Sequence, residues 1–503
     1  MTATSALSFT DAVAQYDPVL GFEIHVELNT ATKMFSEAPN AFGSEPNTNV
    51  TEVDLGMPGV LPVVNRVAVE SAIKLGLALN CTIAPRSEFA RKHYFYPDLA
   101  KNFQTSQYEQ AIAQDGWVDV ELEDGTVFRV DIERAHLEED AGKLTHVGQS
   151  GRIHAASHAL VDYNRAGVPL IEIVSKPIVG AGERAPELAR AYVQTIRDIV
   201  RALDISDARM ERGNLRCDAN VSLMPKATTQ FGTRTETKNV NSLRAIGHAV
   251  DYEIRRQAGI LSAGDHVVQQ TRHWQEETRS TTPGRIKSDA DDYRYFPEPD
   301  LVPIEVDRAW RDRMAAQLPE LPADRRRRLK AEWGLSDATF RDIVHADALD
   351  VIEETIAAGA SAAAASKWWM GEIARLANAA DVEVTALGIT PQHVAELETL
   401  ITAGTINDRL ARQVLGHVAD GEGSPAEVVA ARALAVVSDD GALTVAIDAA
   451  IASNPEVVAK VQAGKTQAIG ALIGPVMQAT GGKADAGRVR QILAEKLGLH
   501  PKD

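Results

Sequence analysis

The sequence predicts an α+β fold in which a mainly antiparallel sheet domain is followed by a helical half. Several separate segments before residue 301 alternate strictly between apolar and polar residues, a period of two that is typical of half-buried strands. Beyond residue 305 the chain becomes rich in alanine and poor in aromatic residues, which favours helices. Pro297, Pro299 and Pro303 mark the boundary between the two halves.

The composition is that of an ordinary soluble globular protein. The 503 residues are 45% hydrophobic and 24% charged, and the length suits about two to four domains. The chain has no apolar run long enough to cross a bilayer and begins without signal-peptide features, so we expect a cytoplasmic protein with no membrane partner. Cys81 and Cys217 are too few for a disulfide framework or a four-cysteine zinc site.

The first predicted strand follows a leader, residues 1–17, that we expect to be loose. Apolar residues such as Phe22 and Ile24 alternate with Glu23 and His25. The acid and the histidine therefore lie on one face, about 7 Å apart. That spacing could serve one metal ion, although a half-buried strand with a solvated face has the same pattern.

An acidic stretch, His136 to Lys143, is the centre of the functional interpretation. Glu138, Glu139 and Asp140 are consecutive carboxylates between a histidine and a lysine. Close carboxylates repel by roughly 1 kcal/mol per pair in water and by more in a cleft, and a cation such as Mg²⁺ relieves that repulsion. Such runs are more often solvated loops, so other segments must support a metal site.

Glu172 lies inside an otherwise apolar strand predicted within residues 161–174. A carboxylate in that position needs a partner or a raised pKa. A structural salt bridge is the commoner explanation, and a functional acid is the alternative.

Two later strands, predicted near residues 214–223 and 233–239, are polar along one face and apolar along the other. Cys217 falls on the apolar face, so we do not expect a catalytic thiol. Acid and amide groups on several strands suit a cradle for a cation and a phosphate-bearing ligand better than simple solvation does, and nearby cationic side chains could clamp the phosphate. The polar faces carry Arg216, Asp218, Asn220, Ser222, Arg234, Glu236 and Lys238.

Basic and aromatic residues interleave from Arg91 and Lys92 to residue 107. Single-stranded nucleic acid ends and nucleotides prefer such surfaces, and a polar rim around a tyrosine cluster explains the pattern equally well. Because the net charge of −18 argues against bulk electrostatic binding of nucleic acid, any such contact depends on specific residues. Further basic residues among aromatics near the domain end are Arg272, Arg285, Lys287 and Arg294.

A helical tail is predicted from about residue 426. Ser424 to Glu427 form a capping box with proline at the first helical position, after a glycine-rich joint. The basic run Arg325 to Lys330 is usually a solvated helix face, and phosphate contact is the alternative. The tail residues that could contact an RNA backbone are Lys460, Lys465, Lys483, Arg488, Arg490 and Lys496.

Six runs in fixed order resemble the B subunit of bacterial aspartyl/glutamyl-tRNA(Asn/Gln) amidotransferases, over nearly the whole chain. The resemblance implies a cradle domain at 1–304, a helical domain at 305–425 and a tail domain at 426–503 that contacts tRNA. The matching runs are residues 21–28, 58–65, 136–143, 162–174, 216–222 and 292–301.

The resemblance also implies an ATP-dependent carbon–nitrogen ligase. Its activity would be phosphorylation of the side-chain carboxylate of Glu or Asp misacylated on tRNA, then amidation by ammonia, with ATP and Mg²⁺ in the cradle. The implied metal ligands are Glu23, His25, Asp218, Glu236 and either Glu138 or Glu139, and the resemblance does not say which of that pair contacts the metal. The implied catalytic residues are Glu138, Glu139 and Lys143. For nucleotide or substrate binding we expect Arg91, Lys92, Arg216, Asn220, Lys238, Arg272, Arg285 and Arg294, and for tRNA binding Lys465, Lys483, Arg488 and Arg490.

The chain has no Walker A motif, so it is not a P-loop kinase, and it has no activated cysteine, so ammonia must come from elsewhere. The resemblance assigns the supply of ammonia to an amidase (A) subunit, with a small C subunit bracing the pair. A non-catalytic tRNA-binding scaffold is the alternative. Many family members hold zinc with four cysteines; here Ser36, Ala38, Thr51 and Asp54 take those places, so we expect no zinc.

Overall fold

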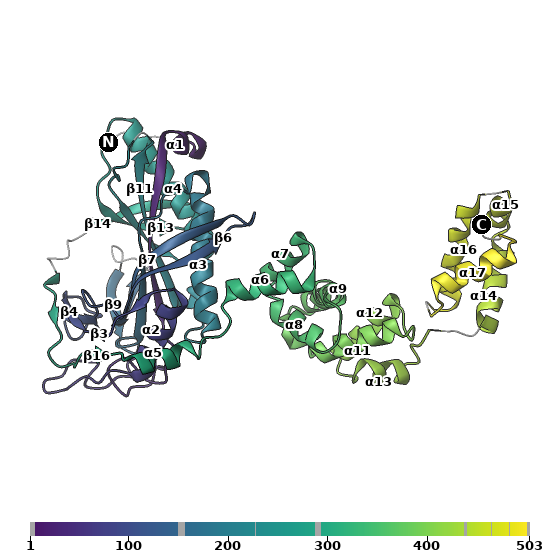
Figure 1. Cartoon of the computed structure of the whole chain (residues 1–503), viewed down its shortest axis with the longest axis horizontal. Helices are drawn as coiled ribbons and strands as arrows, with labels where there is room; N and C mark the ends of the chain where they lie inside the picture. Colours follow the sequence, from purple (N-terminus) through teal and green to yellow (C-terminus); the bar gives the residue numbers. More distant parts are fainter. Residues whose placement is uncertain are drawn as a thin grey trace. The chain divides into compact units, whose positions relative to one another are not determined.

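The computed structural model divides into two compact units, Met1–Arg325 and Arg326–Asp503. A large sheet dominates the first unit and helices make up the second, which confirms the predicted α+β class (Figure 1). The predicted domain boundaries at residues 304 and 425 stay predictions. The structure describes residues 6–148, 156–226, 228–286, 293–436, 440–463, 465–481 and 483–499.

The sheet of the first unit has twelve strands, and ten of them follow the order β14-β13-β12-β11-β1-β10-β7-β5-β4-β15. Strand β6 pairs with β7 and with β2. The described pairings are antiparallel except that between β12 and β13. The strands are β1 (Tyr16–Glu27), β2 (Thr82–Ile83), β4 (Ala90–His93), β5 (Phe103–Ser106), β6 (Ala113–Glu121), β7 (Val127–Glu139), β10 (Pro169–Ser175), β11 (Leu215–Pro225), β12 (Thr235–Val240), β13 (Gln270–Gln275), β14 (Ser280–Ile286) and β15 (Phe296–Pro297).

In the described part of the first unit, two smaller ribbons and the α-helices α1 to α5 accompany the sheet. Helices α3 and α4 lie along one face of the sheet (Figure 1). The ribbons are β3 (Arg86–Ser87) with β16 (Ile304–Glu305) and β8 (Lys143–Gly148) with β9 (Ala156–Asp162). The helices are α1 (Phe9–Gln15), α2 (Arg66–Ala78), α3 (Ala185–Ala202), α4 (Leu243–Ser262) and α5 (Arg308–Ala315).

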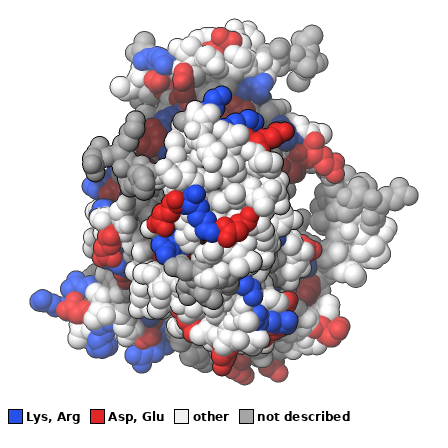
Figure 2. Space-filling view, turned by 90° about the vertical axis from the view of Figure 1, so that its right-hand side faces the viewer, with Lys and Arg blue, Asp and Glu red and all other residues white. Residues whose placement is uncertain are grey.

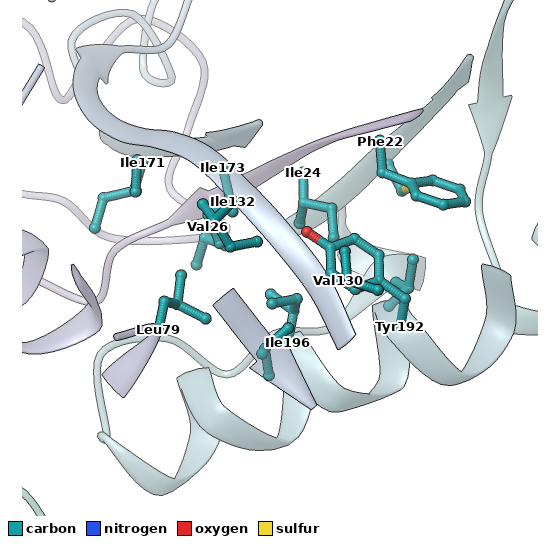
Figure 3. Packing of buried hydrophobic residues seen from close by; sticks show 14 of the residues in the cluster. Phe22, Ile24, Val26, Leu79, Val130, Ile132, Ile171, Ile173, Tyr192 and Ile196 are labelled. Carbon is teal, nitrogen blue, oxygen red and sulfur yellow. The ribbon is translucent and has the colours of Figure 1, made fainter. Parts of the chain in front are cut away.

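Strand β1 shows how the alternation of residues separates the core from the site. Phe22 and Ile24 are fully buried against α3, where Tyr192 and Ile196 complete the apolar layer (Figure 3). The rings of Phe22 and Tyr192 have centroids 5.3 Å apart. Because successive residues of a strand point to opposite faces, burying this set leaves the intervening polar residues on the face away from α3.

Two local expectations were wrong. Residues 9–15 of the supposed leader form α1, whose first turn is capped by the Ser8 hydroxyl, and Ala12 and Val13 enter the core. Strand β12 begins at Thr235, so Arg234 lies before it and is exposed rather than sharing its polar face.

The second unit contains two hydrophobic cores, one built by residues from Ile343 to Leu434 and one by residues from Leu443 to Leu493. The described residues contain no helix that is long and apolar enough to cross a membrane. The helices are α6 (Pro322–Trp333), which spans the division, α7 (Asp337–His345), α8 (Leu349–Ala357), α9 (Ala362–Lys367), α10 (Ala374–Ala380), α11 (Pro391–Thr402), α12 (Asp408–Ala419), α13 (Pro425–Ala431), α14 (Asp440–Ser453), α15 (Pro455–Gln462), α16 (Gly470–Ala479) and α17 (Ala486–Lys496).

Candidate active site

The strand register brings the predicted acids together on the sheet face opposite α3. Strand β1 lies between β10 and β11, which places Glu23 opposite Asp218 and His25 opposite Glu172. Directly paired residues point to the same face of a sheet. Their side chains therefore converge although they are far apart in the sequence.

The first group of ligands, the Glu23 cluster, consists of Glu23, Asp218 and Glu236. Each offers one oxygen, and these three atoms lie within 4.8 Å of one another. The Lys238 ammonium is ion-paired with Asp218 and lies 3.6 Å from Glu236. The Asn220 amide donates to Glu23 at 3.2 Å. Three carboxylates held this closely favour cations, and oxygen donors suit Mg²⁺.

The second group, the Glu138 cluster, consists of His25, Glu138 and Glu172, again with ligand atoms within 4.8 Å of one another. His136 Nε2 lies 3.2 Å from Glu172. Burial alone would raise the pKa of Glu172, but His136, His25 and Lys92 hold it well below its usual range. Glu172 is therefore ionised at neutral pH, as a metal ligand must be.

Two cationic side chains complete this face. Burial would lower the pKa of Lys92, but Tyr295 and the carboxylates of Glu138 and Glu172 raise it, so Lys92 stays charged beside the Glu138 cluster. Arg216 donates to Asp140 at 2.6 Å. These groups can offset negative charge on a phosphate-bearing ligand.

The donor set fits a divalent cation with a phosphate-bearing ligand. Carboxylate oxygens predominate, with one imidazole nitrogen, and such sets suit Mg²⁺ or Mn²⁺. In the described part of the chain, the buried Oδ1 of Asn220 and Nε of Arg216 have no hydrogen-bond partner. Buried polar atoms in native proteins are normally paired, so both are suited to contact a ligand.

Glu139 and Arg91 are not brought to this face. Glu139 follows Glu138 in strand β7, so it points the other way, where it is ion-paired with Lys101 and accepts from the Thr105 backbone at 2.9 Å. Arg91 forms a bidentate pair with Glu298 at 2.7 and 2.8 Å. Glu139 is thus neutralised by the half-buried Lys101, and Arg91 neutralises the buried Glu298.

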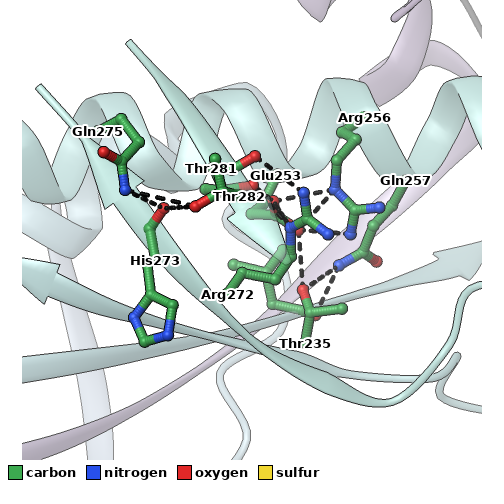
Figure 4. Close-up of polar contacts among 10 residues, drawn as sticks. Thr235, Glu253, Arg256, Gln257, Arg272, His273, Gln275, Thr281 and Thr282 are labelled. Carbon is green, nitrogen blue, oxygen red and sulfur yellow. Dashed lines mark hydrogen bonds and ion pairs between the residues drawn. The ribbon is translucent and has the colours of Figure 1, made fainter. Parts of the chain in front are cut away.

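Arg272 also lies on the wrong side for a ligand contact. It points toward α4, where it lies 3.0 Å from Glu253 and donates to Thr281 at 2.7 Å (Figure 4). Arg256 and Thr235 bind the same carboxylate. The network ties β12, β13 and β14 to α4.

The remaining predicted cradle residues are placed as follows. Lys143 is exposed at the start of β8, opposite Asp162 in the separate ribbon. Arg294 is exposed, and its backbone oxygen contacts the His93 ring at 3.2 Å. The side chain of Arg285 and all of Lys287 lie outside the described residues.

The predicted RNA-contacting residues lie in the second core region of the second unit. Lys465 and Arg490 are exposed, whereas Lys483 donates to the backbone oxygen of Ala433 at 2.7 Å and Arg488 to Gln491 at 3.1 Å. On the face drawn in Figure 2, basic and acidic side chains are interspersed. Contact with RNA there would depend on individual side chains rather than on a broad basic field.

The positions that would carry zinc ligands form a hydrogen-bonded group. Asp54 accepts from Ser36 at 2.9 Å and from Thr51 at 3.1 Å, and it lies 3.5 Å from the buried Lys33. Ala38 is buried nearby in the loop. The absence of zinc stays a prediction.

Glu172 and His136 are the residues that sequence reasoning left out of the site. Glu172 carried a signal, because it interrupts an apolar strand, but a structural salt bridge explained it equally well. His136 was noted as the first residue of the acidic stretch but was not predicted as a site residue, since only the pairing of β7 with β10 places it opposite Glu172.

The comparisons with known proteins cover almost the whole chain. The family model described as the GatB/GatE catalytic domain matches residues 18–312, and the one described as the GatB domain matches residues 350–497. A protein of Paenarthrobacter aurescens, named as the B subunit of aspartyl/glutamyl-tRNA(Asn/Gln) amidotransferase, is 66% identical over 500 residues, which is 99% of this chain and 100% of the relative. The chain belongs to this family.

Other proteins named as B subunits are similarly close in sequence to this chain. The relatives from Pseudarthrobacter chlorophenolicus and an Arthrobacter species are 66% and 65% identical over 500 residues, again 99% of this chain and 100% of each relative. The resemblance to the B subunit seen in the sequence is thereby confirmed. The catalytic-domain match contains both clusters, and the second match contains the predicted RNA-contacting residues.

Proposed function

We propose that this chain uses ATP to phosphorylate the side-chain carboxylate of glutamate on tRNA(Gln) or of aspartate on tRNA(Asn). Ammonia then displaces the phosphate and gives the amide. The observation that carries the proposal is the convergence of the Glu23 and Glu138 clusters on one sheet face, with Lys238, Lys92 and Arg216 beside them.

Phosphorylating a carboxylate requires a surface that can bind both a metal ion and phosphate groups. A free carboxylate is a poor acceptor for ammonia because its leaving group would be oxide, whereas an acyl phosphate releases phosphate. Mg²⁺, when bound, offsets the charge of the transferring phosphoryl group. Each cluster would hold such an ion by itself, one through Glu23, Asp218 and Glu236 and the other through His25, Glu138 and Glu172.

Two lysines of the chain, Lys238 and Lys92, would act on the phosphate rather than hold the metal ion. Lys238 contacts two carboxylates of the Glu23 cluster, and Lys92 lies beside the Glu138 cluster. Both are placed to bind phosphate oxygens and to orient them toward the substrate carboxylate. Lys143 stays a candidate from the resemblance alone, because it lies in the ribbon of β8 and β9.

The partners in this proposal are an amidase (A) subunit, a small C subunit and the misacylated tRNA. The amidase would supply ammonia from glutamine, and a closed route between the proteins would protect the acyl phosphate from water. Lys465, Lys483, Arg488 and Arg490 would contact the tRNA backbone.

A matched pair of variants in the assembled enzyme tests the proposal. We expect Glu138→Gln to reduce ATP-dependent amidation about a hundredfold or more, because it removes one metal ligand, and Asp218→Asn to do the same. Glu139→Gln, one residue away on the opposite face, should retain more activity than Glu138→Gln.

Glutamine hydrolysis and tRNA binding are measured in parallel, because both should survive in the Glu138→Gln and Asp218→Asn enzymes. Full amidation by both variants would refute the catalytic role and favour a tRNA-binding scaffold with structural acids.

A further inference from the structure

Four tyrosines form a continuous series of ring contacts at the edge of the sheet. Tyr108 and Tyr295 are stacked, with centroids 4.2 Å apart and planes 9° apart. Tyr293 meets Tyr295 edge to face at 6.2 Å, and Tyr94 meets Tyr293 in the same way at 6.3 Å. We call Tyr108, Tyr295, Tyr293 and Tyr94 the tyrosine ladder.

The two middle rings of the ladder, Tyr295 and Tyr293, lie beside Lys92 and the Glu138 cluster. Pairing of Phe296 with Arg91 in the β15–β4 register places Tyr295 next to Lys92. The Lys92 ammonium lies 5.1 Å from the centroid of the Tyr293 ring. Burial and the nearby carboxylates of Glu138 and Glu172 raise the pKa of Tyr295, so its ring is neutral and close to those carboxylates.

The outer end of the ladder is open to solvent. Tyr108 is 41% exposed, although its ring stacks fully on Tyr295. Arg294, between two ladder residues in the chain, is exposed as well. The rings thus lead from the surface toward Lys92 and the proposed reaction site.

We infer that the tyrosine ladder receives the unpaired 3′ end of the aminoacyl-tRNA by stacking of its bases. The inference rests on the proposed function, in which the reacting carboxylate is attached to that end. Such a substrate must bring its amino acid to the cluster while the rest of the RNA stays outside. Unpaired bases stack on aromatic side chains, and the exposed Arg294 suits a backbone phosphate.

The test compares two RNAs on the assembled enzyme: uncharged tRNA, and the same tRNA shortened by its unpaired 3′ nucleotides. Fluorescence anisotropy gives the affinities. We expect Tyr108→Ala and Tyr295→Ala to weaken binding of the full-length tRNA roughly tenfold, the loss typical of one base stack. Binding of the shortened tRNA should not change, because it has no base to stack.

One control keeps an aromatic ring at position 108, and the other removes an aromatic ring outside the tyrosine ladder. Tyr108→Phe keeps the stacking surface and should bind like the wild type. Phe231→Ala removes another exposed aromatic ring, which lines a separate pocket with Leu223 and Leu261, and should leave both affinities unchanged.

Three results would overturn the inference. The alanine variants could weaken both RNAs equally, could weaken neither, or could raise the KM for ATP while tRNA binding stays the same. The last result would assign the rings to the nucleotide. The proposed function fails separately, if the wild-type enzyme shows no ATP-dependent amidation. The two failures can be distinguished because the binding measurements do not require turnover.

Discussion

Glu253 on α4 is a fully buried carboxylate whose charge is balanced within the fold. Arg256 donates to it at 2.7 Å and Arg272 lies 3.0 Å away, while Thr235 and Thr281 donate their hydroxyls. Burial alone would raise its pKa, but Arg256 and the other donors lower it. The carboxylate therefore stabilises the fold as an anion.

We expect Glu253→Gln to lower the free energy of unfolding by about 3 kcal/mol at neutral pH, because it leaves the buried Arg272 and the half-buried Arg256 without their counter-charge. The folded-state pKa lies below the ordinary 4.5. The contribution is thus fully present above about pH 4.5 and is lost as the pH falls through the folded-state value. Thermal unfolding as a function of pH should show a smaller acid-side loss in the variant than in the wild type.

Asp251→Asn is the control on the same helix, since Asp251 is only partly buried and pairs with Arg255 at 3.6 Å. It should change stability by less than about 1 kcal/mol. An equal effect of the two variants would show that the buried network has no special role.

At the scale of single residues, strand periodicity predicts which side chains share a face but not which face forms the site. Glu23, His25, Asp218 and Glu236 were grouped from alternation and resemblance. The structure places Glu23, Asp218 and Glu236 in one cluster and His25 in the other. Arg272 has the residue type that a phosphate site needs. It lies on the α4 side because the packing of α4 decides which face is covered, and no local pattern encodes that packing.

The apolar layer between α3 and β1 contains one polar atom with no partner in the described residues. The hydroxyl of Tyr192 is fully buried, and its ring packs on Phe22. An unpaired buried hydroxyl costs about 1–3 kcal/mol. The ring is thus retained for its volume and shape at this contact.

We expect Tyr192→Phe to raise the free energy of unfolding by about 1 kcal/mol, because the ring stays and the unpaired hydroxyl is removed. Calorimetry on the full chain measures the shift. Tyr163→Phe is the matched control: its hydroxyl donates to the Pro97 backbone at 2.7 Å, so this change should destabilise. A loss of stability in the Tyr192 variant would mean that its hydroxyl has a partner after all.

At the scale of elements, long alternating strands were predictable and short or irregular elements were not. The β11 pattern is visible over residues 214–223, close to the observed Leu215–Pro225. Helix α1 was missed because only Ala12 and Val13 enter the core, which is too little apolar signal to distinguish a helix from a loose leader. The stacking of Tyr108 on Tyr295 could not be predicted from the sequence either, because the two segments come together only in the folded sheet.

Across the whole chain, the hydrophobic cores show where the helical half can be divided. Val428 and Val429 of α13 belong to the core that also contains Ile343, and the next core begins at Leu443. A cut at the predicted boundary of residue 425 would remove α13 from its core. The capping box at Ser424 marks the start of a helix but does not show which core that helix joins.

Binding of Mn²⁺ in place of Mg²⁺, followed by electron paramagnetic resonance on the full chain, tests the central claim most directly. Carboxylate-rich sites accept both ions. Asp218→Asn and Glu138→Gln should each weaken Mn²⁺ binding by about ten- to a hundredfold, whereas Glu139→Gln should bind as the wild type does. Unchanged binding in the first two variants, or equal loss in all three, would contradict the assignment of this sheet face as the metal and phosphate site.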